Sequence, residues 1–244
     1  MNGDGNNVAA LDYLMQQLFS QALGGPLGRE VLGLDKLQQR RMYIGWLIQA
    51  AHLTQYTSSH QALVATRVCA TDLEYARYCL NHALEELGHE RMALADLQSL
   101  GLDAAGLSVL PPPLPSTAAL TAYLYFAAER AHPATRLGFT FWAERCYGIL
   151  APIFGTARGN LGLDRSQMRF FVAHAVIDEA HGRDVVEIIP HVCTDSAAWA
   201  ATEAGLRTSL TLAMAMFGEL AAVAKGTHGL TPDYDRFFAP AMAR

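Results

Sequence analysis

Histidine and carboxylate residues in two short segments form the clearest chemical pattern in the sequence. They fall into two trios with identical spacing: His82, Glu86 and His89, and His174, Asp178 and His181. On an α-helix, steps of four and seven residues rotate a side chain by about +40° and −20°, so each trio shares one narrow face. Burying such a face without a compensating cation would cost several kcal/mol. A divalent metal ion would compensate all of these groups together.

A surface role is the alternative for either trio alone, because a histidine and an acid four residues apart more often pair on a helix surface. Apolar neighbours argue against that role. They are Leu80, Ala83 and Leu87 around the first trio, and Val172, Ala173, Val176 and Ile177 around the second. Two trios of equal spacing in such surroundings favour a metal site.

A further carboxylate, Glu144, lies in the apolar segment 139–147. Arg130 and Arg145 are possible ion-pair partners for it. If both trios converge on the same core, we expect Glu144 to bind or bridge metal there. Oxygen ligands mixed with imidazole are typical of non-haem iron or manganese, whereas these ligands are too many for one tetrahedral zinc site.

The elements that must position these residues are helices. Apolar residues recur at intervals of three and four, and no segment alternates like a strand, so the fold class is all-α. We expect one domain, residues 1–244, folded as a compact bundle of about seven helices with irregular tails at 1–7 and about 227–244. The expected helices are 8–23, 37–58, 61–100 with a break near Ala70, 117–130, 133–154, 165–189 and 196–225. Ser116, Asp164 and either Thr194 or Asp195 are the expected helix caps.

Composition limits the partners and the compartment. A net charge of −5 and a pI near 6.0 give no reason to expect nucleic acid or an anionic membrane surface. The N-terminus lacks the pattern of a signal peptide, and no apolar run looks long enough to span a bilayer, so we expect a cytoplasmic protein. The four cysteines form no CxxC pair and are expected to be buried apolar residues.

These motifs resemble the haem-oxygenase-like diiron oxidases and oxygenases, which share a seven-helix fold with haem oxygenase, TenA-type thiaminase and pyrroloquinoline quinone synthase. The resemblance rests on the His-x-x-x-Asp-x-x-His run that ends at His181, on Glu144, and on the segment from His82 to His89. It implies two iron ions and dioxygen as cosubstrate. The ligands that it implies are Glu86, His89, Glu144, His174, Asp178 and His181.

One departure leaves the early ligand open. Some family members place a glutamate seven residues before the first ligand histidine, where this chain has His82. Glu85 and Glu86 lie about 40° and 60° around the helix from His89, on opposite sides, so both can reach a metal. We prefer Glu86, because it reproduces the spacing from Asp178 to His181. His82 and Glu85 stay alternatives, with His82 either a ligand or a partner that orients a carboxylate.

The resemblance also implies an oxygenase that acts on a small organic substrate and needs an external reductant. We favour N-oxygenation of an amine in a biosynthetic pathway. The alternatives are oxidative carbon–carbon cleavage or desaturation of an amino or fatty acid, and a cofactor-free enzyme of the TenA or quinone-synthase type with Cys79 or Cys146 as nucleophile. Arg130, Arg145 and Arg183 are available for a substrate carboxylate. The apolar last long helix makes a homodimer possible.

Overall fold

Helices make up most of the computed structural model, which describes the backbone of residues 4–242 and the side chains of residues 7–174 and 180–239. No strand occurs in the backbone so described. The helices are α1 (Asp4–Gly24), α2 (Pro26–Leu32), α3 (Lys36–Thr54), α4 (Thr57–Val68), α5 (Leu73–Glu85), α6 (Glu90–Ser99), α7 (Pro115–Glu129), α8 (Thr135–Ala143), α9 (Tyr147–Leu161), α10 (Arg169–Val192), α11 (Ser196–Lys225) and α12 (Thr231–Met242), with short 3-10 helices η1 (Leu107–Val109) and η2 (Arg165–Gln167). The all-α prediction is confirmed.

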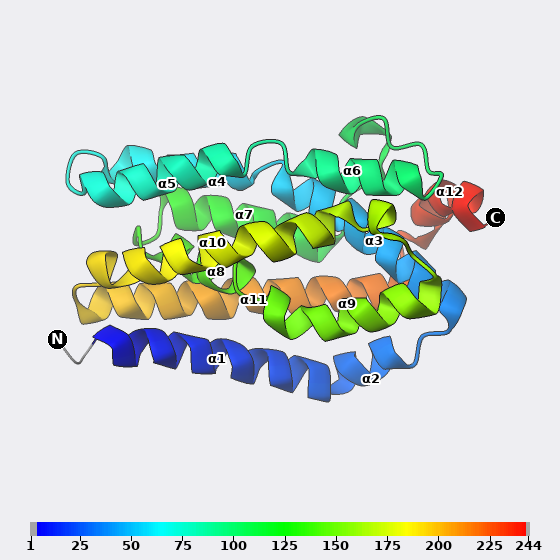
Figure 1. Cartoon of the computed structure of the whole chain (residues 1–244), viewed down its shortest axis with the longest axis horizontal. Helices are drawn as coiled ribbons and strands as arrows, with labels where there is room; N and C mark the ends of the chain where they lie inside the picture. The colour runs from blue at the N-terminus through cyan, green and yellow to red at the C-terminus, as the bar shows by residue number, and fades with distance from the viewer. Residues whose placement is uncertain (1–3, 243–244) are drawn as a thin grey trace.

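The long helices run along the long axis of the molecule (Figure 1). Helices α5 and α6 follow each other along one edge in this view, and α1 and α2 follow each other along the opposite edge. The 30-residue helix α11 packs against α3, α7 and α8, while α10 contacts α5, α6 and α8. The helices that carry the two trios therefore meet inside the bundle.

Helix α8 crosses α11 with the two backbones in direct contact. A Cβ atom added at Gly138 would lie 2.1 Å from the Thr202 carbonyl oxygen, and one added at Gly205 would lie 1.9 Å from the Thr135 carbonyl oxygen. Only glycine fits at both positions, because any side chain would push the helices apart. This crossing fixes the position of α8, which leads directly to Glu144.

The described residues form more helices than the seven expected, because several expected helices are interrupted. The break near Ala70 is confirmed between α4 and α5. Further breaks separate α3 from α4, α5 from α6 and α8 from α9. The last two fall at residues 86–89 and 144–146, so expected helices 61–100 and 133–154 were wrong at the positions of the candidate ligands.

The tails and caps also differ in part from the predictions. The expected irregular tails were wrong where described, because α1 begins at Asp4 and α12 covers Thr231–Met242. Asp195 caps α11 by accepting from the Ala198 amide at 2.8 Å, as expected. Ser116 caps no helix, since its amide and hydroxyl both donate to Glu219. Asp164 caps η2 instead of the long helix that follows.

Helix α11 is long and apolar enough, by length and composition, to cross a membrane, contrary to the sequence-based expectation. It packs mainly against α3, α7 and α8 and also contacts α1, α2 and α12, as a core helix does, and core helices of globular proteins pass the same test. Its apolar character is therefore explained by burial within the bundle.

Candidate metal centre

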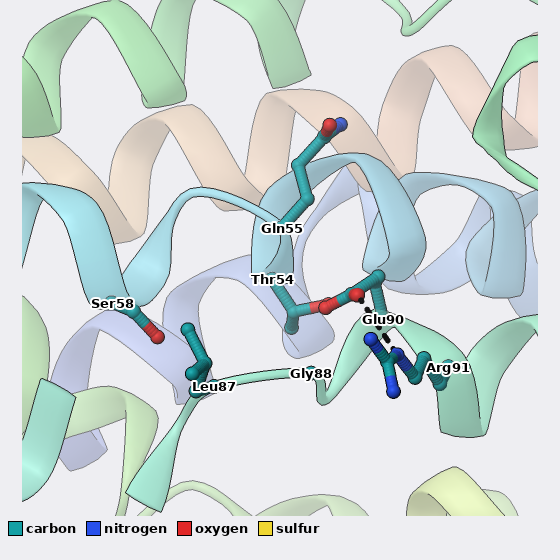
Figure 2. A pocket seen from close by; sticks show the side chains of 7 residues that line it. All are labelled: Thr54, Gln55, Ser58, Leu87, Gly88, Glu90 and Arg91. Carbon is teal, nitrogen blue, oxygen red and sulfur yellow. Dashed lines mark ion pairs between the residues drawn. The ribbon is translucent and has the colours of Figure 1, made fainter. Parts of the chain in front are cut away.

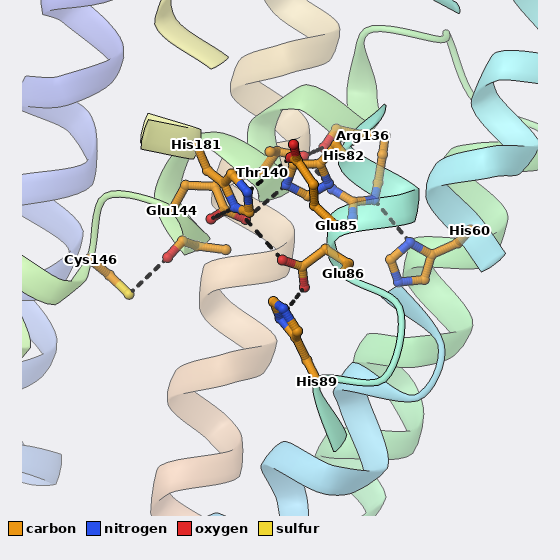
Figure 3. A network of polar contacts seen from close by, with 11 residues as sticks. His60, His82, Glu85, Glu86, His89, Arg136, Thr140, Glu144, Cys146 and His181 are labelled. Carbon is orange, nitrogen blue, oxygen red and sulfur yellow. Dashed lines mark hydrogen bonds and ion pairs between the residues drawn. The ribbon is translucent and has the colours of Figure 1, made fainter. Parts of the chain in front are cut away.

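Four buried side chains from α5, α8 and α10, or from their ends, converge in the middle of the bundle (Figure 3). One nitrogen or oxygen atom from each of them lies within 4.8 Å of the others. The four residues are His82, Glu86, Glu144 and His181. Two imidazoles and two carboxylates in one buried cluster form a mixed nitrogen and oxygen donor set that suits iron or manganese.

The α5–α6 turn brings the early residues to this cluster. Helix α5 ends at Glu85, and Gly88 adopts φ +92°, a left-handed conformation that interrupts the helix. His89 then precedes α6. The early trio therefore does not lie on one continuous helix face, as its spacing predicted. The turn still directs Glu86 and His89 inward, because both side chains are buried.

Glu144 lies at the corresponding break between α8 and α9. Its Oε1 atom accepts from His82 Nε2 at 3.1 Å, and its Oε2 atom accepts from His181 Nδ1 at 3.2 Å. Burial raises the pKa of Glu144, but the hydrogen bonds from His181 and His82 outweigh burial and hold the pKa well below its usual range. Glu144 is therefore a carboxylate that joins α5, α8 and α10.

His181 is surrounded by carboxylates. Its Nε2 atom lies 3.0 Å from Glu85 Oε2, and its Nδ1 atom lies 3.7 Å from Glu86 Oε1. Burial lowers the pKa of His181, yet the hydrogen bond to Glu144 and the charges of Glu144, Glu86 and Glu85 raise it to about 9. This negative surrounding attracts a proton, and it would attract a metal cation for the same reason.

Glu86 connects this cluster to a second pair of histidines. Its Oε2 atom lies 3.2 Å from His89 Nδ1, while its Oε1 atom lies 3.7 Å from His181 Nδ1. The rings of His89 and His174 meet edge to face with their centroids 4.8 Å apart. Glu86 thus lies between two groups of histidines.

His174 is held as a metal-binding histidine usually is. Its Nδ1–H donates to the Phe170 carbonyl at 2.7 Å, which leaves Nε2 without a proton and free to bind a cation. Burial is the main cause of its lowered pKa, so the ring is neutral. Asp96 on α6 fixes the start of α10 by accepting from the Arg169 and Phe170 amides, each at 2.9 Å. This contact keeps α10 beside the helix that follows His89.

Unpaired ring nitrogens of His82 and His89 are a further feature that fits a metal. His82 Nδ1 and His89 Nδ1 are buried and have no hydrogen-bond partner, although His89 Nδ1 lies close to Glu86. Buried nitrogens without partners are costly unless something else binds there. A metal held near His89 would supply that partner.

Five of the six expected ligands are thus brought together: Glu86, His89, Glu144, His174 and His181. The side chain of Asp178 lies outside the described residues. Of the alternatives, His82 belongs to the buried cluster, while Glu85 is more than half exposed at its edge. The apolar-neighbour argument was wrong for Leu80, Leu87 and Val172, which are exposed. Leu80 and Val172 lie on the solvent-facing sides of α5 and α10, and Leu87 lies in the α5–α6 turn.

Arg136 is a buried charge that the sequence analysis missed. It lies on α8 two turns before Glu144, and its side chain is fully buried. The available signal was a lone arginine eight residues before Glu144, at the start of an apolar helix and on the same face. Arg145, by contrast, pairs with Asp12 at 3.0 Å and is partly exposed.

A cavity of about 360 Å³ adjoins the α5–α6 turn (Figure 2). Its lining residues are Thr54, Gln55, Ser58, Leu87, Gly88, Glu90 and Arg91. The same turn therefore contributes Leu87 and Gly88 to this cavity, and Glu86 and His89 to the candidate metal centre.

Comparisons with known proteins identify the family and the fold of the chain. A model of the family of iron-containing redox enzymes matches residues 44–214. A crystal structure from Shewanella denitrificans, described as a domain of unknown function with a heme oxygenase-like fold, is 29% identical, with a TM-score of 0.82 over 91% of this chain and 96% of that one. A TenA homolog from Pseudomonas syringae pv. tomato is 18% identical, with a TM-score of 0.60 over 84% of this chain and 91% of that one, and shows the fold alone. None of the curated proteins compared with the chain matches it. With the family model covering more than half of its length, the chain belongs to the iron-containing redox enzymes and has a haem-oxygenase-like fold.

Proposed function

We propose that this chain binds two iron ions and uses them to activate dioxygen for the oxidation of a small organic substrate. The observation that carries the proposal is the position of Glu86, whose two oxygens face His181 on one side and His89 on the other. A carboxylate between two groups of imidazoles is suited to bridge two metals. A site for one metal would not need ligands on both sides.

Each iron would have its own set of residues. His82, Glu144 and His181 would hold one iron, His89 and His174 would hold the other, and Glu86 would contact both. Asp178 completes the proposed set by its place in the late trio. When bound, the irons supply the redox chemistry. The chain keeps the centre buried and holds His174 in its metal-binding tautomer.

We favour N-oxygenation of an amine as the reaction. One oxygen atom enters an N–H bond of the substrate, and the other leaves as water, with two electrons and two protons from an external reductant. Glu85 supports an amine substrate, because this carboxylate is more than half exposed beside His181 and would attract an ammonium group.

A cofactor-free mechanism with Cys79 as nucleophile is disfavoured by the state of the thiol. Cys79 is fully buried, and burial, as the largest influence, raises its pKa to about 12. The thiolate is the reactive form of cysteine, and at neutral pH this side chain stays a thiol.

Anaerobic titration of metal-free protein with ferrous iron tests the proposal. We expect about two equivalents per chain, with nitrogen and oxygen but no sulfur ligands by X-ray absorption. Exposure to oxygen should then produce a transient visible absorption, and amine oxidation should be detected by mass spectrometry of the products. Saturation at one equivalent, or sulfur ligation, would contradict the dinuclear site.

A further inference from the structure

Arg136 lies in the core with its guanidinium only partly satisfied. Nε donates to His60 Nδ1 at 3.1 Å, and Nη1 donates to Thr140 Oγ1. The guanidinium carbon lies 4.5 Å from the centroid of the Phe139 ring. Nη2 is buried and has no hydrogen-bond partner.

Among the described side chains, Arg136 forms no ion pair with a carboxylate. Burial accordingly lowers its pKa, against the attraction of the Tyr78 and Tyr75 phenols and of Glu144. A buried arginine without a directly paired anion is costly, and replacing it with an apolar side chain is often neutral or stabilising. Packing alone therefore does not account for this residue.

The hydroxyl of Tyr78 is a second buried polar group without a hydrogen-bond partner. Tyr78 interacts electrostatically with Arg136 and stacks on the ring of His82, with the two centroids 6.0 Å apart. His82 in turn contacts Glu144. The unpaired donors of Tyr78 and Arg136 thus lie beside the candidate metal centre and not in a separate part of the core.

Helix α8 sets the separation between Arg136 and the centre. Arg136, Thr140 and Glu144 follow one another at intervals of one turn on the same face, and the backbone rise from the first to the last is about 12 Å. Figure 3 shows Arg136 between His60 and His82, on the side of the cluster that faces α4. A small molecule held by Arg136 and Tyr78 would lie on the His82 side of the centre, because Tyr78 stacks on the His82 ring.

From these contacts we propose that Arg136 Nη2 and the Tyr78 hydroxyl bind the carboxylate of the substrate, so that the enzyme acts on small organic acids such as amino acids. Guanidinium and hydroxyl donors suit a carboxylate, because both donate to an anion whose oxygens accept. The assignment rests on the proposed function for the reaction at the centre, but carboxylate binding itself needs no iron.

Calorimetric titration with benzoate tests this assignment, with benzamide as the uncharged analogue of the same shape. Metal-free and iron-loaded protein are both titrated, so failure to bind iron and failure to bind the carboxylate are seen separately. We expect benzoate to bind both forms and benzamide to bind at least tenfold more weakly. Arg136→Met should weaken benzoate binding at least tenfold while keeping the iron stoichiometry.

Two further variants keep the test decisive if Arg136→Met does not fold. Tyr78→Phe removes only a hydroxyl and should weaken benzoate binding several-fold. Arg236→Met, which changes an exposed arginine of α12, should leave benzoate binding unchanged. The assignment is overturned if benzoate does not bind at millimolar concentration, if benzamide binds equally well, or if Tyr78→Phe and Arg136→Met bind benzoate as the wild type does. Loss of iron binding with intact benzoate binding would instead overturn the proposed function alone.

Discussion

Two histidines of α10, both candidate metal ligands, differ in their protonation. His174 is neutral, with its proton fixed on Nδ1 by the Phe170 carbonyl. His181 has carboxylates near both ring nitrogens and a pKa raised to about 9, against the opposing influence of burial. In the proposed centre, His174 would bind a metal without losing a proton, whereas His181 would have to lose one first. Glu86 lies near His181 and contacts His89, which contacts His174.

Substitution of the two adjacent glutamates tests which of them is the ligand. Glu86→Ala should lose at least one iron per chain, because it removes the carboxylate between the two histidine groups. Glu85→Ala is the matched control and should keep both irons, because that side chain is more than half exposed. Iron content after desalting is the measurement. Retention of both irons by Glu86→Ala, with loss in Glu85→Ala, would reassign the ligand to Glu85.

At the scale of helices, the breaks between helices position the candidate ligands as much as the helices themselves do. Both Glu86 and Glu144 cap the C-terminal end of a helix, α5 and α8 respectively. A side chain at a helix end is less confined by its own helix than one in the middle. Contacts between elements then fix these ends, through the cap that Asp96 provides for α10 and through the glycine crossing of α8 and α11.

The glycine crossing predicts that a glycine-to-alanine substitution in α11 lowers the free energy of unfolding at Gly205, within the crossing, and raises it at Gly218, outside the crossing. Gly205→Ala would place Cβ 1.9 Å from the Thr135 carbonyl oxygen, so the helices must separate, and the free energy of unfolding should fall by about 3 kcal/mol or more. Gly218→Ala meets no atom within 4 Å and should raise it by up to about 1 kcal/mol, since alanine favours the helix. Urea denaturation measures both. Equal effects of the two substitutions would show that the close crossing does not exist in solution.

The whole molecule surrounds the polar centre with apolar helices, so metal binding at the proposed centre would be coupled to stability. The Nδ1 atoms of His82 and His89 are buried and have no hydrogen-bond partner among the described residues. Such groups weaken the core until a ligand satisfies them. The stability of the bundle should therefore depend on metal content and on pH.

Iron should stabilise the fold by mass action. At a free concentration one hundred times the dissociation constant, the gain is about 2.7 kcal/mol, which corresponds to a rise in melting temperature of roughly 5–10 °C. Hydrogen-exchange protection should increase most over residues 170–186 of α10. His181→Ala should remove most of this gain while keeping a helical circular dichroism spectrum. Iron-dependent protection confined to α5 and α6, or full oxygen reactivity of His181→Ala, would contradict the late trio as ligands.

Stability should also fall in mild acid because of His60. This histidine is buried, and burial, then the charges of Arg136 and His82, hold its pKa well below 6.5. The rings of Tyr125 and Phe139 pack around it. The unfolded chain takes up a proton below about pH 6.5 whereas the folded chain does not, so stability is present above that pH and is lost as the pH falls.

His60→Gln isolates this contribution, because glutamine can still accept from Arg136 but does not titrate. In metal-free protein, the free energy of unfolding of the wild type should fall relative to the variant by at most about 1.4 kcal/mol per pH unit below pH 6.5. The difference should be constant above about pH 7.5. A difference that does not change between pH 8 and pH 5 would show that His60 is protonated alike in both states.

The sequence by itself determined the helical class and the residue types of the centre. Three- and four-residue periodicity is a local property, and so is the spacing that brings His174 and His181 to one face of the continuous helix α10. The pairing of histidines with carboxylates also points to a hard metal from composition alone. These features need no knowledge of which helices are neighbours.

Only the tertiary structure decided where the helices break and what the buried charges face. Gly88 could have been tolerated within a helix, but the chain turns there, and this turn places Glu86 between His181 and His89 while leaving Glu85 at the edge. The sequence shows Arg136 only as a lone arginine at the start of an apolar helix, and its burial beside His60 of α4 is decided by the tertiary structure. The physical reason is the same in both cases. The environment of a side chain is formed by residues far away in the chain, and the local spacing of residues does not specify which of them will be neighbours.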